Sequence, residues 1–442
     1  MTLVHTQLRL TVVALTVLVA STVRADTPVI EVTGADFRPF PVAVPDVTVQ
    51  GAGGKAGGRS ATELTAIVRD GVNIVRALEL VSPSSYLAPK DEPWTAPVYD
   101  SWSNVGASGL VRAVVESKPP HVVAKMRFYD VVSQRELLSR IYVEKPANIS
   151  RAAHKFLDEL VELLTGQKGI FSSKLAYVQK TKQGKAIFVS DYDGRNARRI
   201  TDPKVISLLP SWDTRGGSVL FTSYLKSNPD IYRYNIKSKK LEWLSNKRGL
   251  NTGAAVSPNG KRIALTLSID GNTEIYVMDS KGDNLKRLTD NWGEDVSPTW
   301  SPDGTRIAFV SSRAGNPHIY VMAADGSQQK RLTFQGNYNQ EPDWSPKAGG
   351  QIVFTARDER LKYDIFAVDP GSGSITRLTQ DEGNNESPSY SPDGNQIVFT
   401  STRAGGKKIF VMDVDGRNQR AITKGGGYET PAWSPAPGYP ER

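Results

Sequence analysis

A serine–proline pair recurs at a nearly constant interval through the second half of the chain. Successive copies lie 44, 44, 46 and 43 residues apart, and a step of 46 residues back from the first reaches Ser211 in a degenerate copy. A period of about 40–50 residues is typical of structural repeats, each of which buries its apolar face against its neighbours. This half of the chain is therefore expected to consist of equal units. The clear copies are Ser257-Pro258, Ser301-Pro302, Ser345-Pro346, Ser391-Pro392 and Ser434-Pro435.

Each copy contains the same order of short segments. A turn such as Pro302-Asp303-Gly304 comes first, then an apolar stretch such as 306–310, then an Ile-Tyr or Ile-Phe segment, and then Arg-Leu-Thr or a variant. Proline fixes φ and glycine accepts positive φ, so Pro-Asp-Gly indicates a tight turn between strands. Four short strands per unit are typical of a β-propeller blade, and the 3.6-residue spacing of a helical repeat is missing.

The two ends of the repeat region determine the number of blades. Five copies begin at or after Ser211, and upstream segments at 175–178, 186–189 and 199–201 match only the three later strands of a sixth copy. The chain end supplies the missing first strand, Pro431-Ala432-Trp433. Pairing of the two ends would close the ring and hide a sheet edge that would otherwise be open. We therefore predict a mainly β protein, with a six-bladed propeller over residues 169–436.

Residues 26–165 lack the repeat and are expected to form a small N-terminal α/β domain. Residues 51–58 are rich in glycine and are expected to form a loop. Ser60-Ala61-Thr62-Glu63 fits a capping box, which predicts a helix from Ser60 to about Leu80. A second helix with one apolar face is expected from Ser150 to Thr165-Gly166. Strands are expected at 47–50, 110–116, 121–131 and 136–144.

Residues 1–25 have the pattern of a secretory signal peptide. Arg9 precedes an apolar run from Leu10 to Ala20, and Val23-Arg24-Ala25 fits an A-x-A-like cleavage site. The run is shorter than the roughly 20 residues that a membrane-spanning helix needs. We expect secretion, cleavage between Ala25 and Asp26, and no transmembrane segment.

Composition and charge exclude several classes of function. The chain has no cysteine, which excludes disulfides, thiol nucleophiles and thiolate metal sites. Its formal net charge is +9, but Lys and Arg are interleaved with Asp and Glu, and no basic helix or aromatic–basic cluster is present. We expect a solvated surface and no nucleic-acid partner; an acidic protein partner or the envelope surface is the alternative.

Motifs for enzymatic chemistry are incomplete. Residues 53–60 nearly fit a phosphate-binding P-loop, but Arg59 replaces its lysine. Residues 106–110 approach the G-x-S-x-G nucleophile motif and lack its last glycine. His121, His154 and His318 fall in separate elements without metal-ligand spacing. We expect no enzyme activity, no cofactor and no metal.

The repeats and the junction between the two domains together resemble the TolB family. The resemblance extends over nearly the whole mature chain, and its most specific part is the junction followed by Ser-Asp-Tyr-Asp-Gly. The similar segments are Leu164–Phe171, Leu175–Val178, Val189–Gly194, Val105–Glu116, the helix at 152–164 and Pro431–Pro435.

The resemblance implies a periplasmic, non-enzymatic protein-binding scaffold of the Tol–Pal system. It implies that one propeller face binds Pal, the peptidoglycan-associated lipoprotein, and that the mature N-terminal segment binds the inner-membrane protein TolA. Other outer-membrane proteins are further candidate partners, and membrane association would occur only through partners. The implied role is to maintain the outer membrane and assist constriction at division. The candidate residues of the TolA segment are Asp26, Val29, Val32 and Phe37, because alternating apolar residues can add a strand to a sheet edge.

The candidate Pal face lies where the repeat brings six loops together. Each loop follows an Arg-Leu-Thr strand and leads to the next inner strand, so all six are expected at one mouth of the channel. At 250, 253 and 296, which match Pal-binding positions of the family, members often carry histidine, alanine and threonine, and this chain departs at all three. Glu341 and Glu386 are expected on the exposed rim, where reversing both charges would weaken Pal binding and leave the fold intact. The candidate residues are Leu250, Asn251, Gly253, Glu294, Val296, Tyr338, Glu341, Asn384, Glu386 and Tyr428.

An enzyme or a sugar-binding lectin that uses the central channel is the alternative function. The same loops offer a possible ring of carboxylates, which could also be an acidic rim that complements a cationic peptide. Its members would be Glu294, Asp295, Glu341, Glu386 and Glu429.

Overall fold

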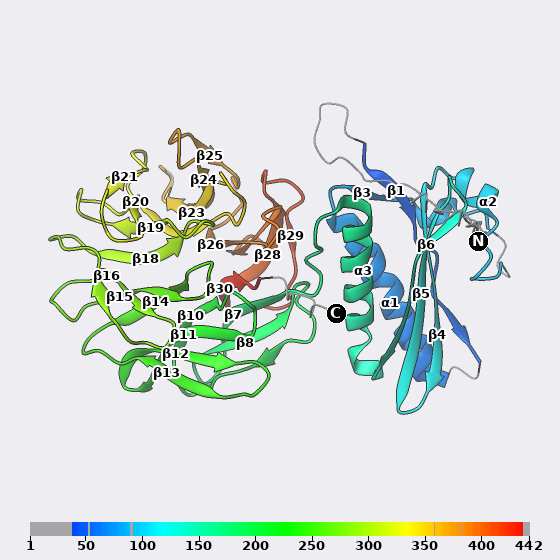
Figure 1. The fold of residues 1–442 in the computed structure, drawn as a ribbon, viewed down its shortest axis with the longest axis horizontal. Coiled ribbons are helices and arrows are strands. Elements are labelled where there is room, and N and C mark those ends of the chain that lie inside the picture. Colours follow the sequence, from blue (N-terminus) through cyan, green and yellow to red (C-terminus); the bar gives the residue numbers. More distant parts are fainter. Residues whose placement is uncertain (1–37, 52–53, 89–91, 358, 381, 436–442) are drawn as a thin grey trace, which may run out of the picture.

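The computed structural model describes residues 38–435, apart from 52–53, 89–91, 358 and 381. Within this range an N-terminal α/β domain and a six-bladed β-propeller lie side by side (Figure 1). The predicted signal peptide and its cleavage site lie outside the described residues. No helix in the described part of the chain is long and apolar enough to cross a membrane.

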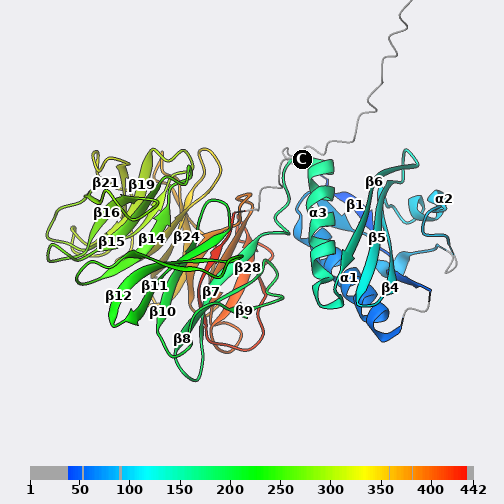
Figure 2. The same cartoon turned by 60° about the horizontal axis from the view of Figure 1, so that its bottom comes forward.

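The N-terminal domain has one mixed sheet covered by two helices. Its strand order is β3-β1-β4-β5-β6, and β2 also pairs with β4. Helices α1 (Gly54–Ile74) and α3 (Ser150–Thr165) lie between this sheet and the propeller (Figure 2). The other elements are β1 (Phe40–Ala43), β2 (Thr48–Gln50), β3 (Leu78–Leu80), α2 (Tyr99–Ser103), β4 (Gly109–Lys118), β5 (His121–Asp130) and β6 (Arg135–Glu144), with 3-10 turns at Pro83–Ser85 and Pro146–Asn148.

Most of the predicted elements of this domain are confirmed. Strands β4, β5 and β6 occupy the predicted ranges to within two residues. Helix α3 runs from Ser150 to Thr165 and is capped by Gly166, which adopts φ 69°. The two helices approach closely because Gly71 of α1 has no side chain. A Cβ added there would lie 2.4 Å from Leu157 Cδ1 of α3.

The predicted start and end of the first helix are wrong. Helix α1 begins at Gly54, so residues 54–58 are helical rather than a loop, and Ser60 is buried inside the helix instead of capping it. The helix ends at Ile74, and β3 then pairs with β1 in parallel. Glycines disfavour a helix by about 1 kcal/mol each. Here tight packing against β2 outweighs that preference, since a Cβ on Gly57 would lie 3.3 Å from Val49 Cγ1.

The propeller consists of six four-stranded sheets, as predicted. We number the blades in chain order and list their strands from the channel outward. Blade 1 contains β30 (Tyr428–Trp433), β7 (Lys174–Lys180), β8 (Lys185–Asp191) and β9 (Arg198–Arg199); blade 2 contains β10 (Ser207–Trp212), β11 (Ser218–Lys226), β12 (Asn228–Asn235) and β13 (Leu241–Ser245); blade 3 contains β14 (Asn251–Val256), β15 (Arg262–Leu267), β16 (Glu274–Asp279) and β17 (Lys286–Arg287). Blade 4 contains β18 (Asp295–Trp300), β19 (Arg306–Ser311), β20 (His318–Ala323) and β21 (Lys330–Arg331); blade 5 contains β22 (Asn339–Trp344), β23 (Ile352–Arg357), β24 (Tyr363–Val368) and β25 (Ile375–Arg377); blade 6 contains β26 (Asn385–Tyr390), β27 (Gln396–Ser401), β28 (Lys408–Asp413) and β29 (Arg420–Ala421).

The two ends of the repeat region close the ring, which confirms the predicted pairing. Strand β30 is antiparallel to β7, with Ala432 opposite Ala176 and Trp433 opposite Leu175. The Trp433 side chain is buried, and its Nε1 donates a hydrogen bond to Ser173 Oγ at 2.8 Å. Blade 1 is thus built from both ends of the propeller.

The N-terminal domain rests on turns of blades 1 and 6. Asn196 Nδ2 donates to Ser150 Oγ at 2.9 Å, and Gln396 Nε2 donates to the Ile74 carbonyl at 3.4 Å. These turns lie at the ends of the strands opposite to the loops that join one blade to the next. The N-terminal domain therefore leaves those joining loops uncovered.

If burial of Trp433 holds the ring closed, Trp433→Ala should destabilise the protein by about 3–5 kcal/mol, the usual cost of truncating a core tryptophan. Urea unfolding followed by circular dichroism measures this. The matched control is Trp292→Ala, because that side chain is 76% exposed and its removal should change stability by less than about 0.5 kcal/mol. Equal effects of the two substitutions would contradict this role of Trp433.

Candidate functional site: the loop face and the channel

We call the side of the propeller formed by the loops that join successive blades the loop face. These loops lie at 202–206, 246–250, 290–294, 334–338, 380–384 and 424–427, of which 381 is outside the described residues.

The Arg-Leu-Thr motif fixes the start of each of three loops. Thr289 Oγ1 accepts a hydrogen bond from Ile275 N at 2.9 Å and donates one to buried Glu274 at 2.6 Å. Arg287 Nε donates to the Thr289 carbonyl at 2.7 Å. The loops thus leave from rigid anchors, an arrangement suited to recognition. The same two hydrogen bonds recur in the next two blades. In blade 4, Thr333 is bonded to Arg331 and Ile319. In blade 5, Thr379 is bonded to Arg377 and Ile365.

Every inner strand contains a β-bulge at the same place. The ladder register shifts there in all six blades, and the bulged residue has positive φ. Only Gly253 has the residue type that positive φ favours, so the other five carry a modest backbone cost of roughly 1–2 kcal/mol each. The bulged residues are Leu209, Gly253, Ser297, Glu341, Ser387 and Thr430, and all but Gly253 precede a proline.

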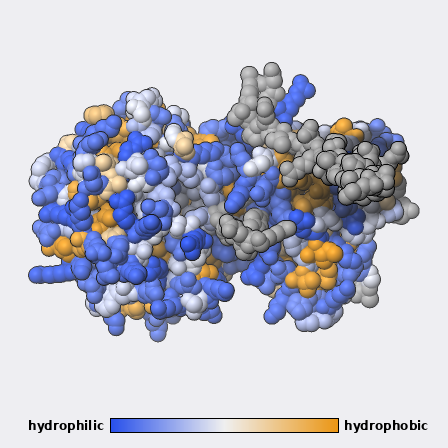
Figure 3. Space-filling view, viewed as in Figure 1, coloured by the Kyte–Doolittle hydropathy of each residue, from blue (hydrophilic) through white to orange (hydrophobic). Residues whose placement is uncertain are grey.

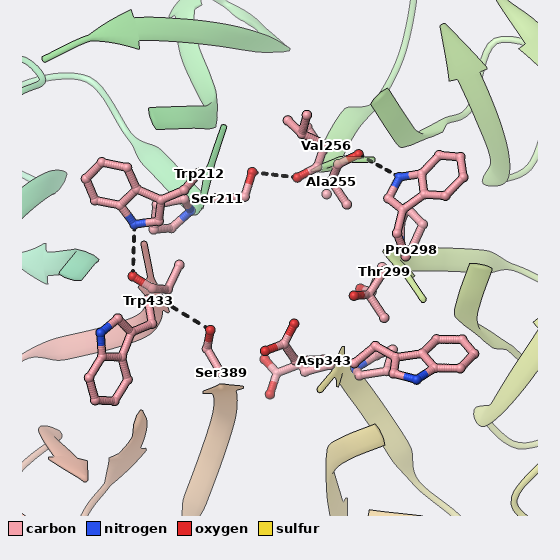
Figure 4. Close-up of a pocket in the computed structure, with 18 of the residues that line it drawn as sticks. Ser211, Trp212, Ala255, Val256, Pro298, Thr299, Asp343, Ser389 and Trp433 are labelled. Atoms are coloured by element: carbon pink, nitrogen blue, oxygen red, sulfur yellow. Dashed lines mark hydrogen bonds between the residues drawn. The ribbon is translucent and has the colours of Figure 1, made fainter. Parts of the chain in front are cut away.

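The inner strands enclose a cavity of about 500 Å³ along the propeller axis (Figure 4). Neighbouring strands are linked through its wall. Trp212 Nε1 donates to the Ala432 carbonyl at 3.0 Å, and Trp300 Nε1 donates to the Ala255 carbonyl at 3.0 Å. The indole groups are therefore committed to contacts between blades.

The predicted ring of carboxylates does not form in the channel. Of its five members only Glu341 lines the cavity. Asp295 is buried and paired with Arg313 at 2.7 Å. Two further members also form ion pairs. Glu386 Oε2 lies 3.0 Å from Lys407 Nζ, and Glu429 Oε2 lies 2.6 Å from Lys185 Nζ. Among the residues that the structure describes, no group of three or more histidine or acidic side chains could hold a metal ion.

Asp343 is a second carboxylate in the channel, and its side chain faces the cavity (Figure 4). Its Oδ2 accepts a hydrogen bond from Tyr390 N at 2.7 Å. Burial raises the pKa of Asp343 from its ordinary value of 3.8 to about 6, although the Tyr390 N–H opposes this shift. The folded protein therefore binds this proton more tightly than the unfolded chain does.

The raised pKa of Asp343 predicts a pH-dependent effect of Asp343→Asn. The contribution of the proton to stability is complete below pH 3.8 and is lost as the pH rises through about 6. The asparagine variant cannot ionise, so its melting temperature should be about 2–4 °C higher than that of the parent near pH 7.5. The difference should be smaller near pH 3.5, where Asp343 is protonated in the parent. Differential scanning calorimetry at both pH values measures this. The same increase at both values would show that ionisation of Asp343 is not the cause.

The ten candidate partner-binding residues all lie in the joining loops or in the loop-side halves of the inner strands. Their exposure differs widely. Glu294 is exposed, Asn251 is fully buried, and the others are half-buried. Tyr338 is among the half-buried ones, and its ring packs edge-on against Tyr363 at 5.4 Å.

The side chains of two of these residues form hydrogen bonds that hold neighbouring segments of the propeller together. Asn251 accepts hydrogen bonds from Ser245 Oγ at 2.7 Å and from Lys247 N at 2.9 Å, which orders the loop before β14. Glu341 accepts hydrogen bonds from Thr355 Oγ1 at 2.8 Å and from Ser387 N at 2.8 Å, and burial raises its pKa. The premise that Glu341 is an exposed rim charge is therefore wrong, and reversing its charge would disturb the contact between blades 5 and 6.

Two exposed aromatic residues of the loop face were missed by the sequence analysis. Trp292 is 76% exposed and Phe334 is 70% exposed, and they occupy corresponding loops before and after blade 4. The Arg331 guanidinium lies over the Phe334 ring at 4.9 Å. The signal was a large aromatic residue one to three positions after the Arg-Leu-Thr motif: Phe334 follows Thr333 directly, and Trp292 comes three residues after Thr289. Such residues are unusual in a surface that is mostly hydrophilic (Figure 3).

The fold and this site define a class of protein: a six-bladed propeller with an N-terminal α/β domain, whose open surface is a loop face rather than a reactive centre. The chain belongs to the TolB family. The TolB amino-terminal domain family matches residues 28–137, and the TolB beta propeller domain family matches residues 161–436. The resemblance inferred from the junction and the repeats is thereby confirmed.

Relatives of known identity agree with this assignment. The chain is 39% identical to the Tol-Pal system protein TolB of Anaeromyxobacter dehalogenans, over 92% of this chain and 94% of the relative. It is 31% identical to the Tol-Pal system protein TolB of Cereibacter sphaeroides, over 50% of this chain and 51% of the relative. The crystal structure of TolB from Acinetobacter baumannii superposes with a TM-score of 0.76 at 26% identity, over 90% of this chain and 97% of that one. The family is a non-enzymatic component of the Tol-Pal system.

Proposed function

We propose that this protein is a periplasmic scaffold of the Tol-Pal system, which binds the lipoprotein Pal through its loop face and TolA through its N-terminal segment. In this role it maintains the outer membrane and assists its constriction at division. The observation that carries the proposal is the position of the loop face. The N-terminal domain rests on opposite-side turns of blades 1 and 6, and two large aromatic side chains, Trp292 and Phe334, are exposed in the joining loops of the loop face.

The loop face has the features of a protein-binding surface. Exposed aromatic residues provide contact area at a small cost in side-chain entropy, and they dominate the energy of many interfaces. The surrounding groups are polar and partly ordered, such as Asn384, whose Oδ1 accepts a hydrogen bond from Tyr363 N at 3.3 Å. A central apolar contact surrounded by polar groups is the usual composition of an interface.

The residues proposed for TolA, Asp26, Val29, Val32 and Phe37, lie outside the described residues. Their support is the family membership and the predicted export of the chain. The described domain begins nearby, with β1 at Phe40. A segment before that strand would be available to pair with a sheet edge of a partner.

Alanine substitution of Trp292 and of Phe334 should each weaken Pal binding by about 2 kcal/mol, or about 30-fold in Kd, as expected for aromatic anchors. Isothermal titration calorimetry with purified Pal measures the change, and unaltered melting curves establish that both variants are folded. Trp243→Ala is the matched control, because Trp243 is 48% exposed but lies on the outer rim of blade 2. Parent-like affinity of the folded double variant would place the Pal site elsewhere.

Removal of the N-terminal segment should abolish TolA binding and preserve Pal binding. The comparison is between a protein that starts at Asp26 and one that starts at Pro39, each titrated with the periplasmic part of TolA and with Pal. Pal serves as the internal control for folding. If the shorter protein binds TolA as tightly as the longer one does, the TolA assignment is wrong.

A further inference from the structure

The outermost strand of blade 2 differs from those of the other five blades. Their outer strands have two or three residues and at least one positive charge, which protects a sheet edge from pairing with other chains. Strand β13 has five residues, and its Leu241 and Trp243 are 43% and 48% exposed. It lies at the rim of the propeller, away from the N-terminal domain (Figure 1). The other outer strands are Arg198–Arg199, Lys286–Arg287, Lys330–Arg331, Ile375–Arg377 and Arg420–Ala421.

The backbone of β13 offers free hydrogen-bonding groups at this edge. In the ladder with β12, Glu242 lies opposite Arg233, and Asn235 N donates to the Lys240 carbonyl at 2.9 Å. Residues of an antiparallel strand face the partner strand alternately. Lys240 and Glu242 thus face β12, and Leu241 and Trp243 direct their N–H and C=O groups outward.

A row of stacked aromatic rings orders the side chains next to this edge. The Trp243 ring stacks on Tyr232 at 5.9 Å and 7°, and the Tyr232 ring stacks on Phe221 at 6.2 Å and 23°. The row crosses three strands and ends at the exposed indole. An apolar residue on an added strand would continue it, since cross-strand pairs stabilise sheets.

The charge around β13 indicates the kind of partner. Residues 226–248 contain seven Lys or Arg and two Asp or Glu. Lys237 and Lys239 precede the strand, Lys247 and Arg248 follow it, and these four exposed side chains form no ion pair within the described residues. A second copy of this chain would bring like charges together, whereas an acidic segment would neutralise them.

We propose that β13 is a docking edge for an extended acidic peptide segment of another protein, which adds to blade 2 as a fifth strand. Apolar residues of the segment contact Leu241 and Trp243, and its carboxylates lie near the lysines at the two ends of β13. The hydrogen-bonding edge of β13 lies on the rim of blade 2, whereas Lys247 and Arg248 belong to the loop 246–250 of the loop face. Strand addition at this edge does not require Pal to bind.

The probe is a fluorescent peptide of about ten residues in which valine alternates with aspartate or glutamate, titrated against the mature protein by fluorescence anisotropy. Leu241→Pro removes an outward N–H without removing a bond to β12, and should weaken binding by more than about 10-fold. Leu241→Ala keeps that N–H and should weaken binding by less than about 3-fold. Leu361→Ala, at an exposed leucine of blade 5, should have no effect. Melting curves establish that each variant is folded.

A second arm changes the peptide and leaves the protein unchanged. N-methylation of every second residue should abolish binding in one register and preserve it in the other, because only one edge of the added strand pairs with β13. Lys237→Glu combined with Lys239→Glu should weaken binding and reduce its dependence on salt. The proposal is overturned if the parent protein does not bind the peptide, if both methylated peptides bind alike, or if Leu241→Pro binds as the parent does. A dimer in sedimentation velocity that Leu241→Pro dissociates would identify β13 as a contact between copies instead.

Discussion

The pairing of β30 with β7 is the interaction on which the rest of the structure depends. It joins segments about 250 residues apart, and the entropic cost of closing such a loop grows only slowly with its length. Burial of Trp433 and its hydrogen bond to Ser173 help to offset that cost. Without the pairing, β7 and β26 would each lose a neighbour, and the six joining loops would not converge on one face.

Ring closure also determines where the N-terminal domain sits. The segment between α3 and β7 runs beside the closing strand, where Ser173 meets Trp433 and Phe171 packs edge-on against Tyr192 at 5.4 Å. Asp158 of α3 accepts a hydrogen bond from Phe171 N at 2.7 Å, and burial raises the pKa of this carboxyl to about 6. The junction thus shares one hydrophobic core with both domains. This placement covers the turns of blades 1 and 6 and leaves the loop face open.

The repeat made the architecture predictable, because spacing and turn chemistry are local properties of the sequence. Six blades, four strands in each and closure by Trp433 all followed from them. The burial of individual side chains on the loop face could not be predicted from these local properties. Asn251 and Glu341 occupy loop-side positions that look exposed in sequence, but a bulge in the inner strand directs Glu341 toward Ser387 of the next blade. The start of α1 was missed for a related reason, since contacts with β2 outweigh the helix propensity of glycine. The burial of these side chains and the start of α1 both depend on tertiary packing, which local sequence does not reveal.

The central claim is that the closed ring presents one face to Pal. Hydrogen–deuterium exchange of the mature protein with and without Pal tests it most directly. Loops 246–250, 290–294 and 334–338 should gain protection on Pal binding, and the turns at 193–196 and 391–395 on the opposite side should not change. Protection of those turns, with unaltered exchange in the three loops, would contradict the account.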